Sequence, residues 1–336
     1  MNLGRAMEFK LSIVVPMYNE EENIQYFYSK ITNVLESNNY QYEIVCVNDG
    51  SKDQTLSRIS AIATKDKRIK VVDLSRNFGK EIAMTAGLRY STGDAVIPID
   101  ADLQDPPELI PQLIEKWQEG YDVVYATRAR REGETFVKKA TAHLFYRFIQ
   151  KITRINIPAD TGDFRLMSRQ VVDALNQLPE QHRFMKGLFS WVGFKQTSII
   201  YQREPRFAGK TSFNYWKLWN FAIEGITSFS FAPLQIAMYL GFAISILALI
   251  YAGFMIVSTL VGGNPVPGYP SLMVAILFFG GVQLITLGVI GEYIGRIYNE
   301  TKRRPLYLVR EVINLSNKKI DLHSGHSEVA ITRESE

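Results

Sequence analysis

Short apolar runs alternate with stretches of helical spacing over the first part of the chain. The apolar runs predict five strands, at residues 11–15, 43–47, 69–74, 95–99 and 121–126. Between the first two runs, apolar residues recur three and four positions apart from Ile24 to Leu35, behind a candidate helix cap at Asn19. Such alternation indicates βαβ units and a mainly parallel sheet, whose ligands bind at the carboxyl ends of the strands.

A second region has a different pattern, because residues 225–291 include no Asp, Glu, Lys, Arg or His in 67 consecutive positions. Two apolar runs lie within it, at residues 234–260 and 271–291. As helices they would be about 40 Å and about 31 Å long, enough to cross a bilayer. We therefore predict a hairpin of two transmembrane helices within residues 233–298. A buried helical hairpin in a soluble protein is the alternative.

Basic residues flank this hairpin on both sides. They are Arg203, Arg206, Lys210 and Lys217 before it, and Arg296, Lys302, Arg303, Arg304 and Arg310 after it. Lys and Arg are retained on the cytoplasmic side, and the first ten residues hold no apolar export signal. We therefore expect an integral protein of the plasma (inner) membrane, with both termini cytoplasmic.

The same patterns predict the domain boundaries. Residues 1–212 would form a cytoplasmic α/β domain, and residues 213–232 an interfacial amphipathic segment that is rich in Trp and Tyr. Residues 299–336 would form a partly disordered cytoplasmic tail.

Composition and charge exclude several classes of protein. The chain has 336 residues, 46% of them hydrophobic and 12% aromatic, so it can bury a sizeable core. Its single cysteine, Cys46, can form neither an internal disulfide nor a cysteine-based zinc site. The formal net charge of +4 is too small for a general nucleic-acid binder. We therefore expect neither redox chemistry nor a nucleic-acid partner.

Polar clusters follow the first two expected strands, as Pro16-Met-Tyr-Asn-Glu20 and Asn48-Asp-Gly-Ser51. Taken alone, the second cluster is typical of an ordinary turn. No G-x-G-x-x-G follows the first strand, and no G-x-x-x-x-G-K followed by Ser or Thr occurs anywhere. A dehydrogenase and a P-loop ATPase are therefore disfavoured.

An acidic cluster, Asp100-Ala-Asp-Leu-Gln-Asp105, follows the fourth expected strand. Three carboxylates within six residues repel one another unless a cation joins them. Mg²⁺ or Mn²⁺ does so with one or two carboxylates, water and substrate phosphate oxygens. An acidic turn that caps the next helix is the alternative.

Basic loops offer the complementary charge. Ser75-Arg-Asn-Phe-Gly-Lys80 precedes a helical pattern, and its glycine and the helix N-terminus suit a phosphate or a base edge. Arg128 follows the fifth strand and opens a basic, partly aromatic stretch that runs to Arg154. This stretch fits a helix on an anionic membrane surface as well as a solvated face over a core stripe.

Taken in order, five motifs resemble the inverting family 2 glycosyltransferases with a GT-A fold. They are the four segments that begin at Pro16, Asn48, Ser75 and Asp100, and Thr161-Gly-Asp-Phe-Arg165. The two-span tail is similar to that of the GtrB-type polyprenyl-phosphate (bactoprenol) glucosyltransferases, relatives of dolichyl-phosphate mannose synthase. The resemblance covers about residues 10–310. It implies an α/β fold class, with a GT-A catalytic domain (Rossmann-like, mainly parallel sheet) followed by a two-helix transmembrane hairpin.

The resemblance also implies roles for individual residues. The nucleotide sugar would be bound by Pro16, Tyr18, Glu20, Asp49, Ser51, Asn77, Gly79, Lys80, Asp100 and Gln104. Asp100 and Asp102 match the D-x-D of the family and, with Gln104, would hold Mg²⁺ or Mn²⁺ and the diphosphate. Asp163 matches the carboxylate near the acceptor and completes the catalytic set with Asp100 and Asp102. Arg128, Arg206 and Lys210 would face phosphate.

The reaction implied is transfer of a single glucose from UDP-glucose to undecaprenyl phosphate at the cytoplasmic membrane face, with inversion. The Q-x-x-R-W segment of processive synthases does not occur in the sequence, so one sugar per turnover is expected. A phosphate monoester has a second pKa of about 6 and is largely dianionic at pH 7. We therefore expect Asp163 to orient the acceptor site or balance its arginines, with base catalysis as the alternative.

Several alternatives stay open. The donor and lipid could be GDP-mannose with a dolichyl-type phosphate, or the donor a UDP-aminosugar. A more remote alternative is a membrane protein that binds a nucleotide sugar without catalysis. Gly280, Gly281, Gly288 and Gly291 in the second span would permit close helix packing, and with it a homo-oligomer.

Overall fold

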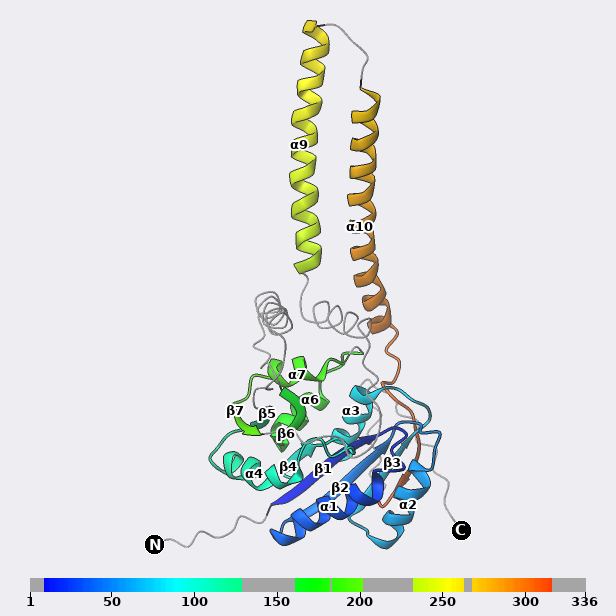
Figure 1. Cartoon of the computed structure of the whole chain (residues 1–336), viewed down its shortest axis with the longest axis vertical. Coiled ribbons are helices and arrows are strands. Elements are labelled where there is room, and N and C mark those ends of the chain that lie inside the picture. Colours follow the sequence, from blue (N-terminus) through cyan, green and yellow to red (C-terminus); the bar gives the residue numbers. More distant parts are fainter. Residues whose placement is uncertain (1–8, 129–160, 182, 202–231, 263–267, 316–336) are drawn as a thin grey trace.

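The computed structural model describes residues 9–128, 161–181, 183–201, 232–262 and 268–315 (Figure 1). Of the candidate site residues, Arg206 and Lys210 lie outside these ranges. The basic stretch after Arg128 and nearly all of the expected interfacial segment also lie outside them.

The described residues form one eight-stranded mixed sheet with the strand order β7-β5-β6-β4-β1-β2-β3-β8. The strands are β1 Lys10–Met17, β2 Gln41–Asn48, β3 Ile69–Leu74, β4 Ala95–Pro98, β5 Val123–Arg128, β6 Thr161–Ser168, β7 Gln196–Tyr201 and β8 Val309–Ile313. The central strands β4, β1, β2 and β3 are parallel, as are β5 and β7. Strand β6 is antiparallel to β4 and β5, and β8 is antiparallel to β3. A mainly parallel α/β sheet is thereby confirmed.

Helices cover both faces of this sheet. They are α1 Ile24–Ser37, α2 Thr55–Lys65, α3 Lys80–Tyr90, the short 3₁₀ helix η1 Pro107–Leu109, α4 Ile110–Gln118, α6 Arg169–Asn176 and α7 Met185–Trp191. One buried cluster joins α1, α2 and α4 to Leu11, Ile13 and Val15 of β1. A second cluster joins α3, α6 and α7 to Val14 on the opposite face of that strand. Alternate side chains of β1 therefore pack into different core clusters on the two faces of the sheet.

The expected elements match the structure at the centre of the sheet and differ at its edges. All five expected strands are present, but β6, β7 and β8 were not expected. The expected cap of the first helix is wrong, because α1 begins at Ile24 and Asn23 holds the N-cap position. Asn19 instead adopts a φ of 54° in the preceding turn. Within the expected tail from residue 299, α10 extends to Thr301 and residues 309–313 form β8 at the sheet edge, while residues 316–336 lie outside the described ranges.

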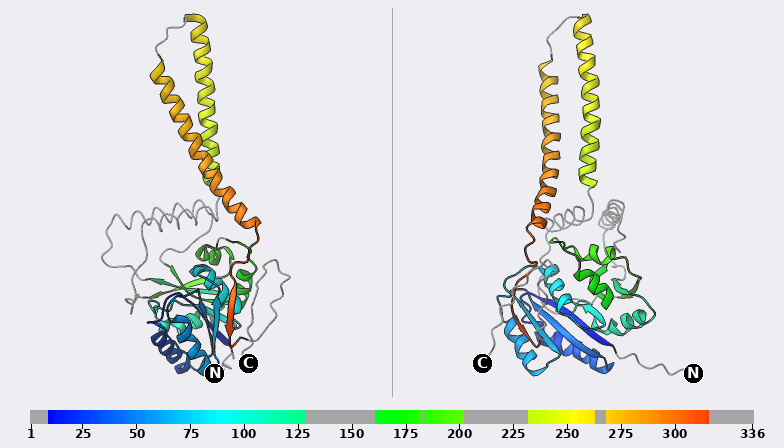
Figure 2. Two further views of the ribbon diagram at one scale, coloured as in Figure 1. Left: turned by 90° about the vertical axis from the view of Figure 1, so that its right-hand side faces the viewer. Right: turned by 180° about the vertical axis from the view of Figure 1, so that it is seen from behind.

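Two long helices, α9 Ala232–Gly262 and α10 Tyr269–Thr301, lead away from the sheet domain side by side (Figures 1 and 2). Many of their apolar side chains are exposed, among them Phe242, Leu247, Phe254 and Leu284. Within the described residues, the segment Phe278–Thr301 is long and apolar enough to cross a membrane. After α10 the chain returns along the edge of the sheet to form β8 (Figure 2).

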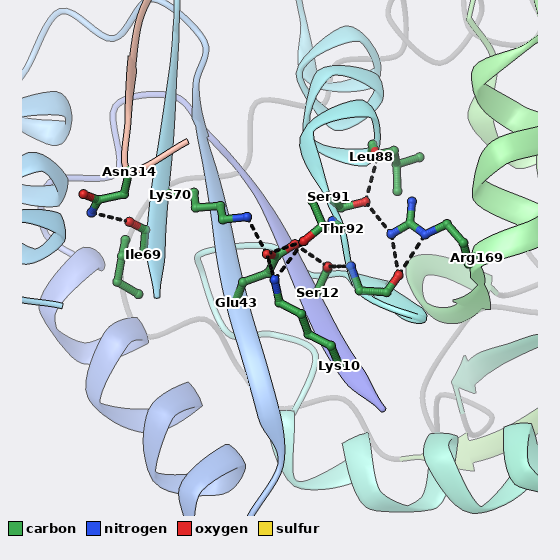
Figure 3. A network of polar contacts seen from close by, with 11 residues as sticks. Lys10, Ser12, Glu43, Ile69, Lys70, Leu88, Ser91, Thr92, Arg169 and Asn314 are labelled. Carbon is green, nitrogen blue, oxygen red and sulfur yellow. Dashed lines mark hydrogen bonds and ion pairs between the residues drawn. The ribbon is translucent and has the colours of Figure 1, made fainter. Parts of the chain in front are cut away.

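A polar network ties the strands together near their amino-terminal ends (Figure 3). Its centre is the buried carboxylate of Glu43 on β2, which pairs with the ammonium groups of Lys10 and Lys70. Ser12 Oγ donates to the same carboxylate over 2.7 Å, and the backbone N–H of Thr92 over 2.6 Å. Every oxygen of this carboxylate therefore has donors, as a buried charge requires.

Candidate functional site

The loops that follow β1, β2, β3 and β4 lie together at the carboxyl ends of these parallel strands. The first residues of β6 join them, because β6 runs antiparallel to β4. All five motifs found in the sequence lie at this edge. Open α/β sheets bind their ligands at such an edge.

Hydrogen bonds join the loops after β1 and β2. The N–H of Asn19 donates to Ser51 Oγ over 3.0 Å, and the N–H of Glu20 donates to Thr55 Oγ1 over 2.8 Å. Tyr18, at the start of the first loop, is 42% exposed. The two loops thus form one wall, and the Tyr18 ring is accessible for stacking against a planar group.

Asp49 holds the loop that follows β3. Its buried carboxylate accepts the backbone N–H groups of Phe78 over 2.7 Å and Gly79 over 2.9 Å. Gly50 has a φ of 64°, and a Cβ at this position would lie 2.4 Å from the carbonyl carbon of Arg76. Only glycine permits this approach of the two loops. Asp49 therefore fixes the backbone from which Lys80 extends.

Lys80, the first residue of α3, joins two carboxylates from distant parts of the chain. Its Nζ lies 2.7 Å from Asp100 Oδ1 and 2.7 Å from Asp163 Oδ2. Burial lowers the pKa of Lys80, but the two carboxylates outweigh burial and raise it above its ordinary value. The Lys80 side chain is 44% exposed, so this cation stands at an open site between the acidic loop and β6.

The acidic loop after β4 has a strained turn. Leu103 adopts a φ of 53°, and the N–H of Gln104 donates to Asp102 Oδ1 over 3.2 Å. Positive φ is uncommon for a bulky residue, and such strain clusters at functional sites. The third carboxylate of the loop, Asp105, is buried and accepts a hydrogen bond from the Tyr201 hydroxyl. Asp105 therefore anchors the loop to β7, whereas Asp100 and Asp102 are only partly buried.

Three charged residues around Asp163 were given no role by sequence reasoning, although Arg165 belongs to the fifth motif. They are Glu81 on α3, Arg165 on β6 and Lys186 on α7, and each acts electrostatically on Asp163. Burial and the Asp163 charge raise the pKa of Glu81 to about 8. Burial would raise the pKa of Asp163, but Lys80, Lys186 and Arg165 lower it to about 2. The one sequence signal for Glu81 is its place beside Lys80.

Oxygen donors in the acidic loop suit a hard divalent cation. Asp100 and Asp102 offer carboxylates and Gln104 offers an amide oxygen, the ligand types that Mg²⁺ and Mn²⁺ prefer. Among the residues that the structure describes, no three His, Cys, Asp or Glu gather as a metal site. In the same ranges, the buried Oδ1 of Asp163 has no hydrogen-bond partner. This partial set fits a cation that also takes water and substrate phosphate as ligands.

The structure brings the described site residues to the same edge of the sheet, although not all of them contact the Lys80 cluster. Asn77 is exposed in the β3–α3 loop, and Pro16 lies within β1 in register with Val47. Arg128 is the last residue of β5, in register with Tyr201. The roles assigned to these residues, and to Arg206 and Lys210 outside the described ranges, stay predictions.

Comparison with known proteins identifies relatives of both parts of the chain. Residues 12–175 match Glycosyl transferase family 2, and residues 232–297 match the GtrB C-terminal hairpin. An uncharacterized glycosyltransferase of Synechocystis sp. is 60% identical over 92% of this chain and 97% of its own. The bactoprenol glucosyl transferase of Shigella phage SfX is 54% identical over 90% of this chain and 99% of its own.

Among solved structures, glucosyl-3-phosphoglycerate synthase from Mycobacterium tuberculosis, in complex with Mn²⁺, UDP and phosphoglyceric acid, is similar with a TM-score of 0.45. It shares 20% sequence identity and covers 65% of this chain and 76% of its own.

Proposed function

This chain belongs to glycosyl transferase family 2, and we propose that it transfers one glucose from UDP-glucose to undecaprenyl phosphate, with inversion at the anomeric carbon. The products are polyprenyl-phosphate-glucose and UDP. Support for glucose and for the lipid acceptor comes from the phage relative, a bactoprenol glucosyl transferase that this chain matches along nearly its whole length.

The observation that carries this proposal is the position of Lys80 between Asp100 and Asp163. Asp100 belongs to the D-x-D loop, which is expected to face the donor diphosphate, and Asp163 belongs to the strand expected to face the acceptor. One ammonium group contacts both carboxylates, so the two halves of a transfer site lie within a few ångströms. Proximity of this kind suits a single displacement without a covalent enzyme intermediate.

The donor half of the site would bind the nucleotide and the diphosphate. Tyr18 and the wall formed by the first two loops would hold the base and ribose, while Asp100, Asp102 and Gln104 would hold Mg²⁺ or Mn²⁺. When bound, the cation neutralises the charge that develops on the departing diphosphate. Lys80 adds a second positive charge at the same place.

The acceptor half would bind the lipid phosphate, one oxygen of which attacks the anomeric carbon as the bond to the diphosphate oxygen breaks. With a pKa of about 2, Asp163 is a poor match for a general base at neutral pH. The phosphate is already largely dianionic there. Asp163 therefore orients the acceptor site and balances its cations.

The hairpin explains how a soluble donor meets a lipid acceptor. A polyprenyl chain stays in the bilayer, so α9 and α10 would hold the catalytic domain at the membrane surface. Retention of Lys and Arg on the inner side favours a cytoplasmic catalytic domain in the plasma membrane. Donor and lipid phosphate would then meet at the cytoplasmic face of the membrane.

The test is transfer of labelled glucose from UDP-glucose to undecaprenyl phosphate by the full chain in detergent, with Mg²⁺ or with EDTA. We expect label in the organic phase with Mg²⁺ and none with EDTA. GDP-mannose and a UDP-aminosugar serve as matched donors. Label from one of these alone would contradict the glucose assignment, and no label from any donor would favour a non-catalytic binding protein.

A further inference from the structure

The segment that follows the membrane hairpin reaches the catalytic domain beside the β3–α3 loop. Glu300, near the end of α10, accepts the backbone N–H of Gln181 over 2.9 Å. Tyr307 and Val309 are then buried in the core cluster that also contains α3. Residues 300–309 are therefore fastened to the domain before β8 begins.

Ser75, the first residue of the β3–α3 loop, is held by this segment through both of its backbone groups. Its N–H donates to the carbonyl of Leu308 over 2.8 Å. Its carbonyl accepts a hydrogen bond from Arg310 Nη2 over 2.7 Å. The start of the loop thus depends on residues that lie more than 230 positions away in the sequence.

Arg310 also neutralises a buried carboxylate under the same loop. Its Nη1 lies 3.3 Å from Asp73 Oδ2, and the Asp73 side chain is 2% exposed. Across the described ranges this is the one ion pair of Asp73, whose other oxygen accepts a 2.7 Å hydrogen bond from Asn48 Nδ2. The Arg310 side chain is itself 58% exposed, so it offsets the burial of Asp73 only in part, and its loss would leave the carboxylate with the neutral donor Asn48.

The other end of the loop leads directly to the site. Phe78 and Gly79 are held by Asp49, the neighbour of Asn48, and Lys80 follows at once. The chain of contacts therefore runs from the end of α10 through Arg310 to the loop, and from the loop to the ammonium group that joins Asp100 and Asp163.

We propose that Arg310 is a positioning residue for the donor half of the site: through Ser75 and Asp73 it sets the loop that carries Lys80, so that the segment leaving the membrane hairpin is part of the nucleotide-sugar site. The proposal rests on the proposed function for its kinetic readout only. Arg310 touches neither substrate nor the reacting atoms in this scheme.

The experiment compares Arg310→Gln and Arg310→Lys in the full chain in detergent. Arg304→Gln is the matched control, because it removes the same charge from an exposed residue of the same segment. For Arg310→Gln we expect the KM for UDP-glucose to rise about tenfold while kcat changes less than about threefold. Arg310→Lys keeps the positive charge beside Asp73, but its single ammonium group cannot reproduce both contacts of the guanidinium. It should therefore recover only part of the lost affinity for UDP-glucose. A KM equal to that of Arg304→Gln, or a loss confined to kcat, would overturn the proposal.

Hydrogen exchange of the loop amides gives a second readout that needs no substrate. In Arg310→Gln we expect faster exchange at Ser75, Phe78 and Gly79 and unchanged exchange in β1. If Arg310→Gln fails to fold, Arg310→Lys is compared with the wild-type chain in the same way. Unchanged protection of the loop would refute the inference, even where the wild-type chain transfers no glucose and the proposed function itself has failed.

Discussion

Two lysine–carboxylate clusters lie at opposite ends of the same parallel strands and are built differently. At the amino-terminal ends, Glu43 is 2% exposed and receives hydrogen bonds from two lysines, a serine and a threonine (Figure 3). At the carboxyl ends, Lys80 joins Asp100 and Asp163 at an open site, where Asp163 Oδ1 lacks a partner within the described residues.

The difference teaches how stability and function divide the sheet. A buried carboxylate whose oxygens all accept hydrogen bonds supports the fold, because removing it leaves its buried donors without partners. A buried carboxylate oxygen without a hydrogen-bond partner leaves a position for a ligand, and it makes the fold less stable until that ligand binds. Mutations in the Glu43 cluster should therefore mainly lower the free energy of unfolding, whereas mutations around Lys80 should mainly lower the transfer rate.

Asp102→Ala should show the largest effect. We expect transfer to fall by about a thousandfold, because the charge on the departing diphosphate loses its main stabilisation. Excess Mn²⁺ should not restore activity. Radiolabel transfer at saturating donor measures the loss, with thermal unfolding as the control for folding. A fully active variant would remove the metal assignment from this residue.

Glu43→Gln should break the other cluster. We expect the free energy of unfolding to fall by about 3 kcal/mol, because Lys10 and Lys70 lose their shared carboxylate. The KM for the donor should not change. Glu36→Gln is the matched control, since Glu36 is 54% exposed in its pair with Arg68 and should cost under about 1 kcal/mol. Equal losses in the free energy of unfolding from Glu43→Gln and Glu36→Gln would show that burial does not strengthen the ion pairs of Glu43.

The same cluster predicts a pH dependence. Burial would raise the pKa of Glu43, but Lys10, Lys70 and Ser12 lower it from its ordinary 4.5 to about 2. A lowered carboxyl pKa stabilises the fold above pH 4.5, and this contribution is lost as the pH falls toward 2. Thermal unfolding between pH 6 and pH 2 should show the loss in the wild type and a smaller loss in Glu43→Gln. Parallel curves would refute the assignment.

Asp163→Asn tests whether the open cluster orients or removes a proton. We expect the transfer rate to fall about fiftyfold, because Lys80 loses one of its two carboxylate partners. This factor should be similar at every pH from 5.5 to 8. Initial rates across this range measure the effect. A variant that keeps most of its rate above pH 7 and loses it at pH 5.5 would instead support base catalysis.

Glu81→Gln should have the smallest effect. Burial and the Asp163 charge raise the pKa of Glu81 from its ordinary 4.5 to about 8. A raised carboxyl pKa destabilises the fold as the pH climbs from 4.5 toward 8, since the unfolded chain ionises first. At pH 8 the variant should gain about 3 °C in Tm over the wild type, and little at pH 5. Thermal unfolding of the variant and the wild type at pH 8 and pH 5 measures the difference. An equal shift in Tm at both pH values would contradict the raised pKa of Glu81.

Sequence reasoning located the site because its residues follow strands. Each polar cluster comes directly after a buried apolar run, and parallel strands bring their carboxyl ends to one edge. The local pattern alone could not distinguish Asp105 from Asp102 in the acidic loop, and only the resemblance to the D-x-D motif set Asp102 apart. Their difference depends on Tyr201, nearly a hundred residues away, whose hydroxyl donates a hydrogen bond to the Asp105 carboxylate.

The sequence by itself determined the alternating α/β domain, the position of the acidic loop after the fourth strand and the long uncharged hairpin, since local periodicity and composition carry these features. Tertiary structure alone decided which charges meet. Lys80 lies between Asp100 and Asp163, Glu81 is buried beside them, and Arg310 reaches Asp73. These contacts join residues from 20 to 237 positions apart, and no local pattern encodes which distant side chains the fold brings together.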